Sequence, residues 1–531
     1  MCGIFALIGY NKPFDESYFH RGKKRGPEFS ELKHIIYGNR KNYLGFHRLA
    51  INGLSSNGNQ PFEYKNYVLI CNGEIYNYKE LIRDYNLNVT SGSDCEVILH
   101  LYHLFGSKCL TKLDGEFSFI IYDRIENFFF IARDPYGVRP LYMNVVGNTF
   151  CFASDIAPMQ FMNTDSLKHF QPGSYMEISG GINYYISKQE KYVQSAPLIA
   201  CDQQEHLYNI YSLLCKAVVK RVENTERPVA CLLSGGLDSS LVAAIASRHL
   251  SKKGVVLETY SIGLEGSEDL KYAQMVADHI KSKHTQIVCT EDDFIYSIPD
   301  VIKDIESYDT TSVRASVGNW NVGKYIKEHS EARVVLNGDG ADELMGGYLY
   351  FHACPNPIQF DCECKRLLND IHIFDVLRSD KSISSHGLEP RTPYLDMDFT
   401  SYYLRIPPGV RCHKANGKPE KYLVRDAFGY IAPDLLPSNI LYRKKEAFSD
   451  GVSSLNHSWY QIIQERVEIT NASLFDKLYT ANPNTIPTTK EQKYYRDLFE
   501  TYYPDCNTIP YFWMPKFINA TDASARTLSI Y

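Results

Sequence analysis

A cysteine stands second in the chain, directly before a glycine and an apolar stretch. If Met1 is removed, Cys2 becomes the first residue, and its thiol lies within proton-transfer reach of its own α-amine. That amine has an ordinary pKa near ~8, so it can accept the thiol proton near neutral pH. Cys2 is therefore a candidate nucleophile for acyl transfer. The alternative is an inert cysteine buried in a strand, which is the usual place of this residue.

Three short segments carry the other groups that acyl transfer from an amide requires. They are residues 47–51 (HRLAI), 71–77 (CNGEIYN) and 91–96 (SGSDCE). The side-chain amide of Asn72 and the N–H of Gly73 can form an oxyanion hole. Arg48 offers a guanidinium fork for a substrate α-carboxylate, and Asp94 offers an anion for its α-ammonium. Taken singly, Arg48 also fits a surface ion pair and Asp94 the first turn of a helix.

A second motif, residues 234–240 (SGGLDSS), follows an apolar stretch and opens a helical pattern. Its glycines let backbone N–H groups approach an anion, its hydroxyls add donors, and a helix N-terminus favours negative charge. The motif is not a Walker loop, because the lysine of that motif is absent. Asp238 suits a Mg²⁺ ion that bridges phosphates, since this hard cation prefers carboxylate and phosphate oxygens. An ordinary glycine turn with a serine cap is the alternative.

Short apolar stretches, rich in aromatic and β-branched residues, predict strands throughout the first part of the chain. They cover residues 2–10, 43–51, 67–72, 116–123, 128–133 and 150–154. One helix is predicted over residues 93–104, with Ser93 as its cap. Consecutive strands with few helices indicate an antiparallel α+β domain.

From about residue 205 the pattern changes to strands that alternate with helices. Strands are predicted at residues 228–233, 255–262, 285–288 and 333–336, and helices at 239–250 and 270–280. This alternation is typical of an α/β domain with a parallel sheet, followed here by a mostly helical part beyond about residue 354. The polar stretch 188–204 is the natural linker. We therefore predict two domains, residues 2–190 and 205–531.

The composition is that of a globular protein, with 44% hydrophobic and 22% charged residues among 531. A net charge of -6 gives no reason to expect nucleic acid or an acidic membrane surface as a partner. The 14 cysteines are scattered singly, which favours a reducing compartment over a disulfide scaffold. Without a signal peptide or a run of residues that could span a bilayer, we expect a soluble cytoplasmic protein.

The segments around Cys2, Asn72 and Asp94, together with residues 133–142 (RDPYGVRPLY), resemble the glutaminase domain of class II amidotransferases, the N-terminal nucleophile family. The resemblance implies an antiparallel sheet sandwich in which Cys2 is the nucleophile and Asn72 and Gly73 form the oxyanion hole. It implies contacts to glutamine from Arg48, Leu49, Ile51, Asn72, Gly73, Glu74 and Asp94.

The second part resembles the ATP pyrophosphatases, and nearly the whole chain resembles the glutamine-hydrolysing asparagine synthetase family. This resemblance implies an ATP site formed by Leu233, Ser234, Gly235, Gly236, Asp238, Ser239, Ile262, Asn337, Gly338 and Lys445. It implies aspartate contacts from Thr311, Ser312 and Arg314, a role for Asp339 in adenylation, and Mg²⁺ held by Asp238 and Asp342. The substrates are then glutamine, aspartate and ATP, and a homodimer is left open.

The family reaction has two stages: glutamine yields ammonia through a thioester, and aspartate yields β-aspartyl-AMP, which ammonia converts to asparagine. The chain departs from the family at the turn 337–341 (NGDGA), where the family usually has Ser-Gly-Glu-Gly-Ser. Two alternatives follow. One is an adenylating enzyme resembling β-lactam synthetase, against which Cys2 argues; the other is an impaired homologue that serves as a regulatory or binding protein.

Overall fold

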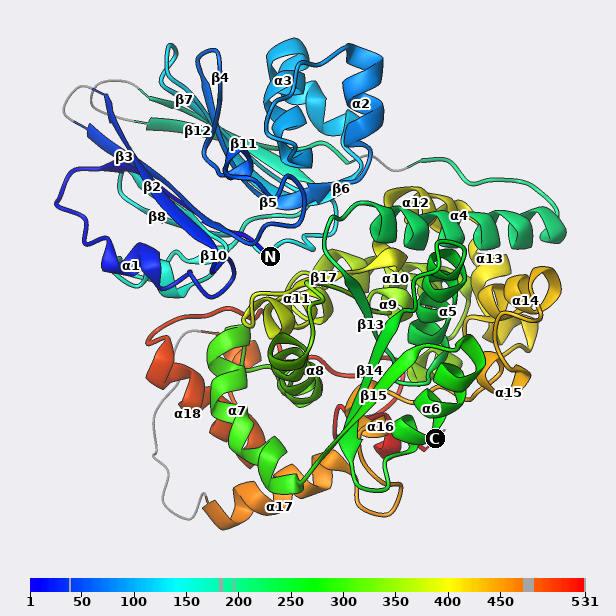
Figure 1. The fold of residues 1–531 in the computed structure, drawn as a ribbon. Coiled ribbons are helices and arrows are strands. Elements are labelled where there is room, and N and C mark those ends of the chain that lie inside the picture. The colour runs from blue at the N-terminus through cyan, green and yellow to red at the C-terminus, as the bar shows by residue number, and fades with distance from the viewer. Residues whose placement is uncertain (38–39, 181–184, 194–195, 471–481, 530–531) are drawn as a thin grey trace.

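The structure is a computed structural model that describes residues 1–37, 40–180, 185–193, 196–470 and 482–529. Two residues of the predicted linker, 194–195, lie outside the described residues. Figure 1 shows the N-terminal strands, in blue and cyan, stacked on a larger part that continues to the C-terminus. None of the described helices combines the length and the apolar character that crossing a membrane requires.

The N-terminal part contains two six-stranded antiparallel sheets. The first has the strand order β10-β8-β9-β1-β3-β2, and the second the order β12-β11-β7-β6-β5-β4. The strands of the first sheet are β1 (Gly3–Tyr10), β2 (Phe29–Tyr37), β3 (Arg40–Arg48), β8 (Tyr142–Val146), β9 (Thr149–Ala153) and β10 (Lys168–His169). Those of the second are β4 (Phe62–Tyr64), β5 (Tyr67–Ile75), β6 (Gly115–Asp123), β7 (Phe128–Arg133), β11 (Ser174–Gly180) and β12 (Tyr185–Lys191).

Side-chain alternation along these strands forms two cores. In β1, Ile4, Ala6 and Ile8 join the hydrophobic cluster between the two sheets, which includes Val68 and Ile120 of the second sheet. Their neighbours Phe5 and Leu7 point to the opposite face of the sheet, where they join a second cluster that extends into the C-terminal part. One sheet is therefore buried on both faces, which places the start of β1 deep in the molecule.

Two helices, α2 (Tyr78–Tyr85) and α3 (Val97–Phe105), lie beside the second sheet (Figure 1). The predicted cap is confirmed, because the Ser93 hydroxyl accepts a hydrogen bond from the Cys95 N–H. The helix itself begins later than predicted, at Val97, since a 3₁₀ turn over Asp94–Glu96 precedes it.

The C-terminal part is built on a five-stranded parallel sheet with the order β15-β14-β13-β16-β17. Its strands are β13 (Val229–Leu232), β14 (Glu258–Leu264), β15 (Lys283–Cys289), β16 (Val334–Leu336) and β17 (Glu389–Arg391). In this sheet, β14 and β15 lie on one side of β13, and β16 and β17, which come later in the chain, lie on its other side. Ligands bind at such a switch point, outside the carboxyl ends of the strands.

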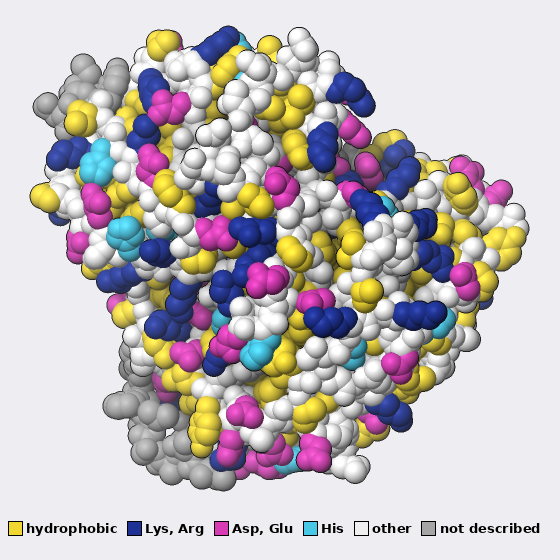
Figure 2. Space-filling view, in the orientation of Figure 1, with side chains coloured by type: hydrophobic (Ala, Val, Ile, Leu, Met, Phe, Trp, Pro, Cys, Tyr) yellow, Lys and Arg dark blue, Asp and Glu magenta, His cyan; other side chains and the backbone are white. Residues whose placement is uncertain are grey.

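Helices pack around this sheet and continue to the C-terminus (Figure 1). The longer ones are α4 (Gln203–Glu223), α5 (Leu237–Ser251), α6 (Glu268–Ile280), α7 (Glu291–Ile305), α8 (Thr310–His329), α10 (Pro357–Asp370), α11 (Asp375–Ser384), α12 (Met397–Arg405), α14 (Tyr422–Ile431), α17 (Trp459–Thr470) and α18 (Lys490–Tyr502). The short helices are α1 (Ser17–His20), α9 (Ala341–Met345), α13 (Pro408–Arg411), α15 (Ser438–Leu441) and α16 (Phe448–Gly451). On the face in Figure 2, acidic and basic side chains are interspersed.

These pairings confirm the predicted fold class, an antiparallel sheet sandwich followed by a parallel α/β sheet with a helical C-terminal part. The sequence did not predict β2, β4, β8, β10, β11, β12 or β17. β17 is three residues long and contains Pro390, which has no N–H to donate. Proline is tolerated there because β17 is an edge strand.

Candidate active sites

The first site lies where β1 begins. The Cys2 thiol is half-buried and donates a hydrogen bond to the Leu49 carbonyl at 3.5 Å. Met1 is buried, and its ammonium donates to the carbonyl of Leu388 in the C-terminal part at 2.9 Å. Burial raises the pKa of the Cys2 thiol to about 12. While Met1 is attached, the thiol therefore stays protonated and Cys2 has no free amine to deprotonate it.

The C-terminal half of β5, a strand that contacts β1, carries three of the predicted residues: Asn72, Gly73 and Glu74. Asn72 is fully buried; its Nδ2 donates to Ser154 Oγ at 3.5 Å, and its Oδ1 has no hydrogen-bond partner among the described residues. A side chain at Gly73 would place a Cβ 2.6 Å from the Glu116 carbonyl oxygen. A side chain at this position would therefore clash with β6, and glycine lets β5 and β6 lie this close together.

Arg48 ends β3 and organises the loop that follows it. Its guanidinium donates to the carbonyl of Ser55 at 2.8 Å and to Asn59 Oδ1 at 2.7 Å, and also to the carbonyl of Gly53. Leu49 and Ile51, the other predicted contacts in this segment, are buried. The structure therefore gives Arg48 a loop-holding role in addition to the glutamine contact that the sequence predicts.

Asp94 and Glu74 lie together on the other side of this site. Asp94 Oδ2 accepts a hydrogen bond from the Ile75 N–H at 2.6 Å, which fixes the carboxylate beside the end of β5. Burial raises the pKa of Asp94 to about 6, and burial together with the Asp94 charge raises the pKa of Glu74 well above its ordinary value. The pair can balance the positive charge of a substrate α-ammonium.

If Asp94 binds the α-ammonium of glutamine, as the family resemblance implies, its pKa predicts a pH-dependent affinity for glutamine. Above pH 6 the carboxylate is ionised and can bind an ammonium; as pH falls through 6 it is protonated and loses its charge. We expect the KM for glutamine to rise about tenfold per pH unit below 6 and to be flat above 7. Glutaminase kinetics from pH 5 to 8 measure this. The Asp94→Asn variant serves as the control, and the same pH dependence in that variant would contradict the assignment.

The second site is a cavity of about 170 Å³ at the carboxyl ends of β13, β14 and β16. Most of the residues predicted for ATP and aspartate line it: Leu233, Ser234, Gly236, Asp238, Ser239, Ile262, Thr311, Asn337, Gly338, Asp339, Asp342 and Lys445. Gly235 does not line the cavity. It has φ +74° and a Cβ there would lie 2.5 Å from Tyr272, so it shapes the turn instead.

Two lysines and two aspartates form a compact cluster in this cavity. Lys421 Nζ lies 2.5 Å from both Asp238 Oδ2 and Asp342 Oδ1. Lys445 Nζ lies 2.5 Å from Asp342 Oδ2 and 3.9 Å from Asp238 Oδ2. Asp238 Oδ1 is buried without a hydrogen-bond partner among the described residues. The sequence did not predict Lys421, which precedes α14 with φ +57° and is 183 residues from Asp238.

Asp339 is held on another wall of the cavity by residues that the sequence did not predict. Arg378 Nη2 lies 3.4 Å from Asp339 Oδ1, and the same guanidinium contacts Asp375. The Gly340 N–H donates to Asp375 Oδ2 at 3.1 Å, so Asp375 also fixes the turn. Burial raises the pKa of Asp339 to about 6. Near neutral pH its carboxylate is ionised and faces the cavity.

Two predicted aspartate contacts do not reach this cavity. The Ser312 hydroxyl donates to Asp309 Oδ2 at 2.8 Å, as part of the cap of α8. The Arg314 guanidinium is 3% exposed and pairs with Glu491 at 2.6 Å and with Asp522 at 2.7 Å. Because both sides of its guanidinium pair with carboxylates, Arg314 connects α8 to α18 and to the C-terminal segment. Thr311 lines the cavity, and its hydroxyl has no hydrogen-bond partner among the described residues.

Comparisons with known proteins cover both parts of the chain. Residues 1–179 match the family described as Glutamine amidotransferase domain, and residues 209–363 and 359–517 match Asparagine synthase. A glutamine-hydrolyzing asparagine synthetase from Homo sapiens is 40% identical over 563 residues, covering 100% of this chain and 99% of that protein. Those from Bos taurus and Gallus gallus are each 39% identical, with the same coverage.

Proposed function

The chain belongs to the family of glutamine-hydrolysing asparagine synthetases, and we propose that its two sites divide the family's reaction between them. The first site releases ammonia from glutamine. The second adenylates aspartate with ATP, and ammonia then displaces AMP to give asparagine. One observation carries this assignment: the glycine turn, two aspartates and two lysines converge in one cavity at the switch point of a parallel sheet.

In the first site, the Cys2 thiol attacks the carboxamide carbon of glutamine. As the sulfur–carbon bond forms, the carbonyl oxygen becomes an oxyanion, which Asn72 Nδ2 and the Gly73 N–H stabilise. The carbon–nitrogen bond then breaks, the thiol proton passes to the departing nitrogen, and ammonia leaves a thioester from which water releases glutamate. The fully buried amide of Asn72 supports this role, because preorganised donors act most strongly away from water.

In the second site, we propose that Lys421 and Lys445 bind the phosphates of ATP and that Asp238 and Asp342 would hold Mg²⁺. Mg²⁺ is commonly held by one or two carboxylates together with phosphate oxygens, and these two aspartates fit that number. The buried, unpartnered Oδ1 of Asp238 is a ligand atom of the right kind. When bound, the ion supplies positive charge against the phosphate oxygens.

The proposed function is tested by incubating the protein with amide-labelled glutamine, aspartate and Mg-ATP. We expect labelled asparagine together with AMP and diphosphate in equal amounts. Glutamine hydrolysis without asparagine would contradict the assignment of the second site. Asparagine made from free ammonia but never from glutamine would contradict the assignment of the first.

The carboxylate of Asp339 is expected to act in adenylation although it is one methylene shorter than the family's glutamate. Misplacement by about 1 Å can cost about 100-fold in rate, so Asp339→Ala should suppress aspartate-dependent diphosphate release by at least ~100-fold. Because Arg378 already holds the shorter side chain at the cavity wall and Asp375 fixes the turn, Asp339→Glu should give no large gain. Diphosphate release is measured in the three proteins.

Glutamine hydrolysis should continue in both Asp339 variants, which shows that they fold. If Asp339→Ala releases diphosphate like the parent, this carboxylate has no catalytic role. If Asp339→Glu gains orders of magnitude, the native turn is impaired, and the alternative of a regulatory homologue is favoured.

The enzyme is further proposed to act in the cytoplasm and to form a homodimer. The compartment is supported by the cysteines, all 14 of which are free thiols, 9 of them buried. The homodimer rests on the family resemblance. Sedimentation of the purified protein measures the oligomeric state directly.

A further inference from the structure

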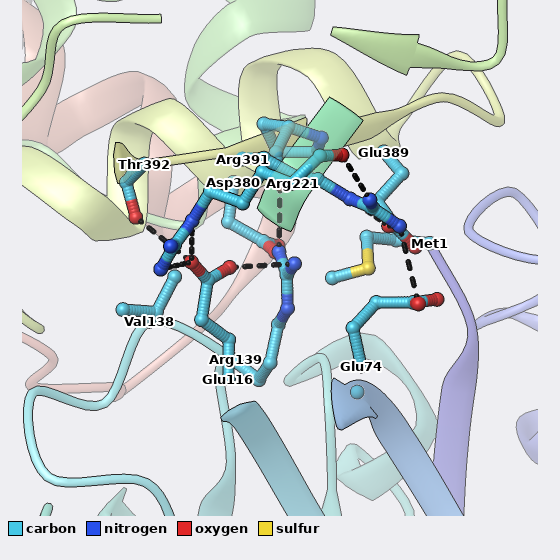
Figure 3. Close-up of polar contacts among 12 residues, drawn as sticks. Met1, Glu74, Glu116, Val138, Arg139, Arg221, Asp380, Glu389, Arg391 and Thr392 are labelled. Carbon is cyan, nitrogen blue, oxygen red and sulfur yellow. Dashed lines mark hydrogen bonds and ion pairs between the residues drawn. The ribbon is translucent and has the colours of Figure 1, made fainter. Parts of the chain in front are cut away.

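The carboxylate of Glu74, in the first site, is held from the C-terminal part of the chain. Glu74 Oε2 accepts hydrogen bonds from Asn52 Nδ2 at 3.0 Å and from Asn224 Nδ2 at 3.1 Å. Arg391 Nη2 lies 3.1 Å from the same oxygen, and the two side chains are 0% and 5% exposed. Figure 3 shows Arg391 and Glu74 facing each other across the boundary between the N-terminal and C-terminal parts of the chain. Two of the three groups on this oxygen therefore come from outside the glutaminase part.

The backbone of Arg391 is hydrogen-bonded to a residue that lines the second site. Arg391 ends β17, where it pairs with Leu336 of β16. Its carbonyl accepts a hydrogen bond from the Asn337 N–H at 3.1 Å. Asn337 lines the nucleotide cavity, and its Oδ1 accepts from the Asp339 N–H at 3.2 Å. One residue thus touches Glu74 with its side chain and the turn 337–339 with its backbone.

The Arg391 side chain cannot easily move apart from its backbone. Its Nε donates to Glu389 Oε1 at 2.9 Å, and its Nη1 donates to the Arg221 carbonyl at 2.5 Å. The guanidinium lies in a close-packed layer of further buried ion pairs, among them Arg139 with Glu116 at 2.8 Å (Figure 3). Because such interiors have few voids, a shift of β17 is passed on to its contacts and is not absorbed locally.

We propose that Arg391 is a positioning residue that couples the two active sites. It holds the Glu74 carboxylate in the orientation that binds glutamine, and it moves with the turn 337–339 when Mg-ATP and aspartate fill the cavity. This inference rests on the proposed function, in which Glu74 contacts glutamine. Binding at the second site then changes the affinity of the first for glutamine, and by linkage the reverse holds to the same degree.

The test compares Arg391→Met, Arg391→Lys and the parent. Glutaminase KM and kcat are measured with and without Mg-ATP and aspartate, and asparagine synthesis is measured with ammonia. In Arg391→Met we expect the KM for glutamine to rise about tenfold, kcat to change less, and the effect of Mg-ATP on KM to disappear. Ammonia-dependent synthesis should stay within about threefold of the parent. Arg391→Lys keeps the charge and should recover part of the KM.

Lys220→Met is the matched control, because Lys220 on α4 also crosses the boundary, pairing with Asp114 and, at 2.7 Å, with Asp396. It does not contact Glu74, so this variant should keep the parent's KM and its response to Mg-ATP. A Lys220→Met variant that matches Arg391→Met would show a general loosening of the boundary and overturn the proposal.

Three further outcomes would overturn it. They are an unchanged KM in Arg391→Met, an equal loss of both activities in that variant, and a parent whose glutaminase does not respond to Mg-ATP and aspartate. These leave the proposed function intact as long as the parent makes asparagine from glutamine. A parent without glutaminase activity would remove the proposed function and this inference together.

Discussion

Cys2→Ala is expected to abolish glutamine-dependent asparagine synthesis while ammonia-dependent synthesis stays within about twofold of the parent. The thioester needs a nucleophilic sulfur, and alanine offers none, so we expect a loss of at least ~1,000-fold in glutaminase turnover. The nucleotide cavity contains no residue of β1, which is why the second reaction should persist. Steady-state assays with each nitrogen donor measure the two activities.

The processing of the terminus provides the control for this variant. Intact-mass analysis of the active parent should show a chain that starts at Cys2, because only then is its amine free. A Cys2→Ala protein that still hydrolysed glutamine, or an active parent that retained Met1, would contradict the nucleophile assignment. Loss of both activities in Cys2→Ala would instead point to misfolding, which Cys2→Ser helps to separate by conserving volume.

Asp238→Asn is expected to remove asparagine synthesis from either nitrogen donor while glutamine hydrolysis continues. The neutral amide is a poor ligand for Mg²⁺ and also leaves Lys421 with one carboxylate in place of two. We expect a loss of at least ~1,000-fold, since adenylation depends on compensating the phosphate charge. Aspartate-dependent diphosphate release measures the step directly.

Raising the Mg²⁺ concentration distinguishes the causes of that loss. Partial recovery at high Mg²⁺ indicates weakened metal binding, whereas no recovery indicates that the lysine–aspartate cluster has rearranged. Normal asparagine formation in Asp238→Asn would exclude Asp238 as an essential metal ligand. The Asp342→Asn variant is the matched comparison, because it removes the other carboxylate that Lys421 contacts.

The strands and helices that carry site residues with a local sequence signal were predicted well from the sequence. The turn around Asp238 lies between an apolar strand and a helix, and the structure places both as expected, with α5 beginning at Leu237. Asn72 ends the predicted strand 67–72 and Gly73 follows it, and both lie in β5, which contacts β1. For such residues, the pattern of the adjacent residues in the sequence is enough to locate the strand, turn or helix that carries them.

Residues whose role depends on distant partners were not predictable in this way. Arg314 was assigned to aspartate, but its partners Glu491 and Asp522 follow 177 and 208 residues later. Lys421 and Arg391 were missed because nothing near them in the sequence points to Asp238 or to Glu74. The three-residue strand that carries Arg391 is too short, and with Pro390 too atypical, to show periodicity.

The lysine–aspartate cluster of the nucleotide cavity also bears on the order in which ligands arrive. Lys421 and Lys445 contribute two positive charges and Asp238 and Asp342 two negative charges, so the four side chains sum to zero. A free divalent cation meets no net attraction there, because two ammonium groups oppose it within a few ångströms of its ligands. Phosphate oxygens can draw the lysines away and leave the carboxylates open to the metal. Under the proposed function, Mg²⁺ would therefore enter this cavity together with its nucleotide and not as the free ion.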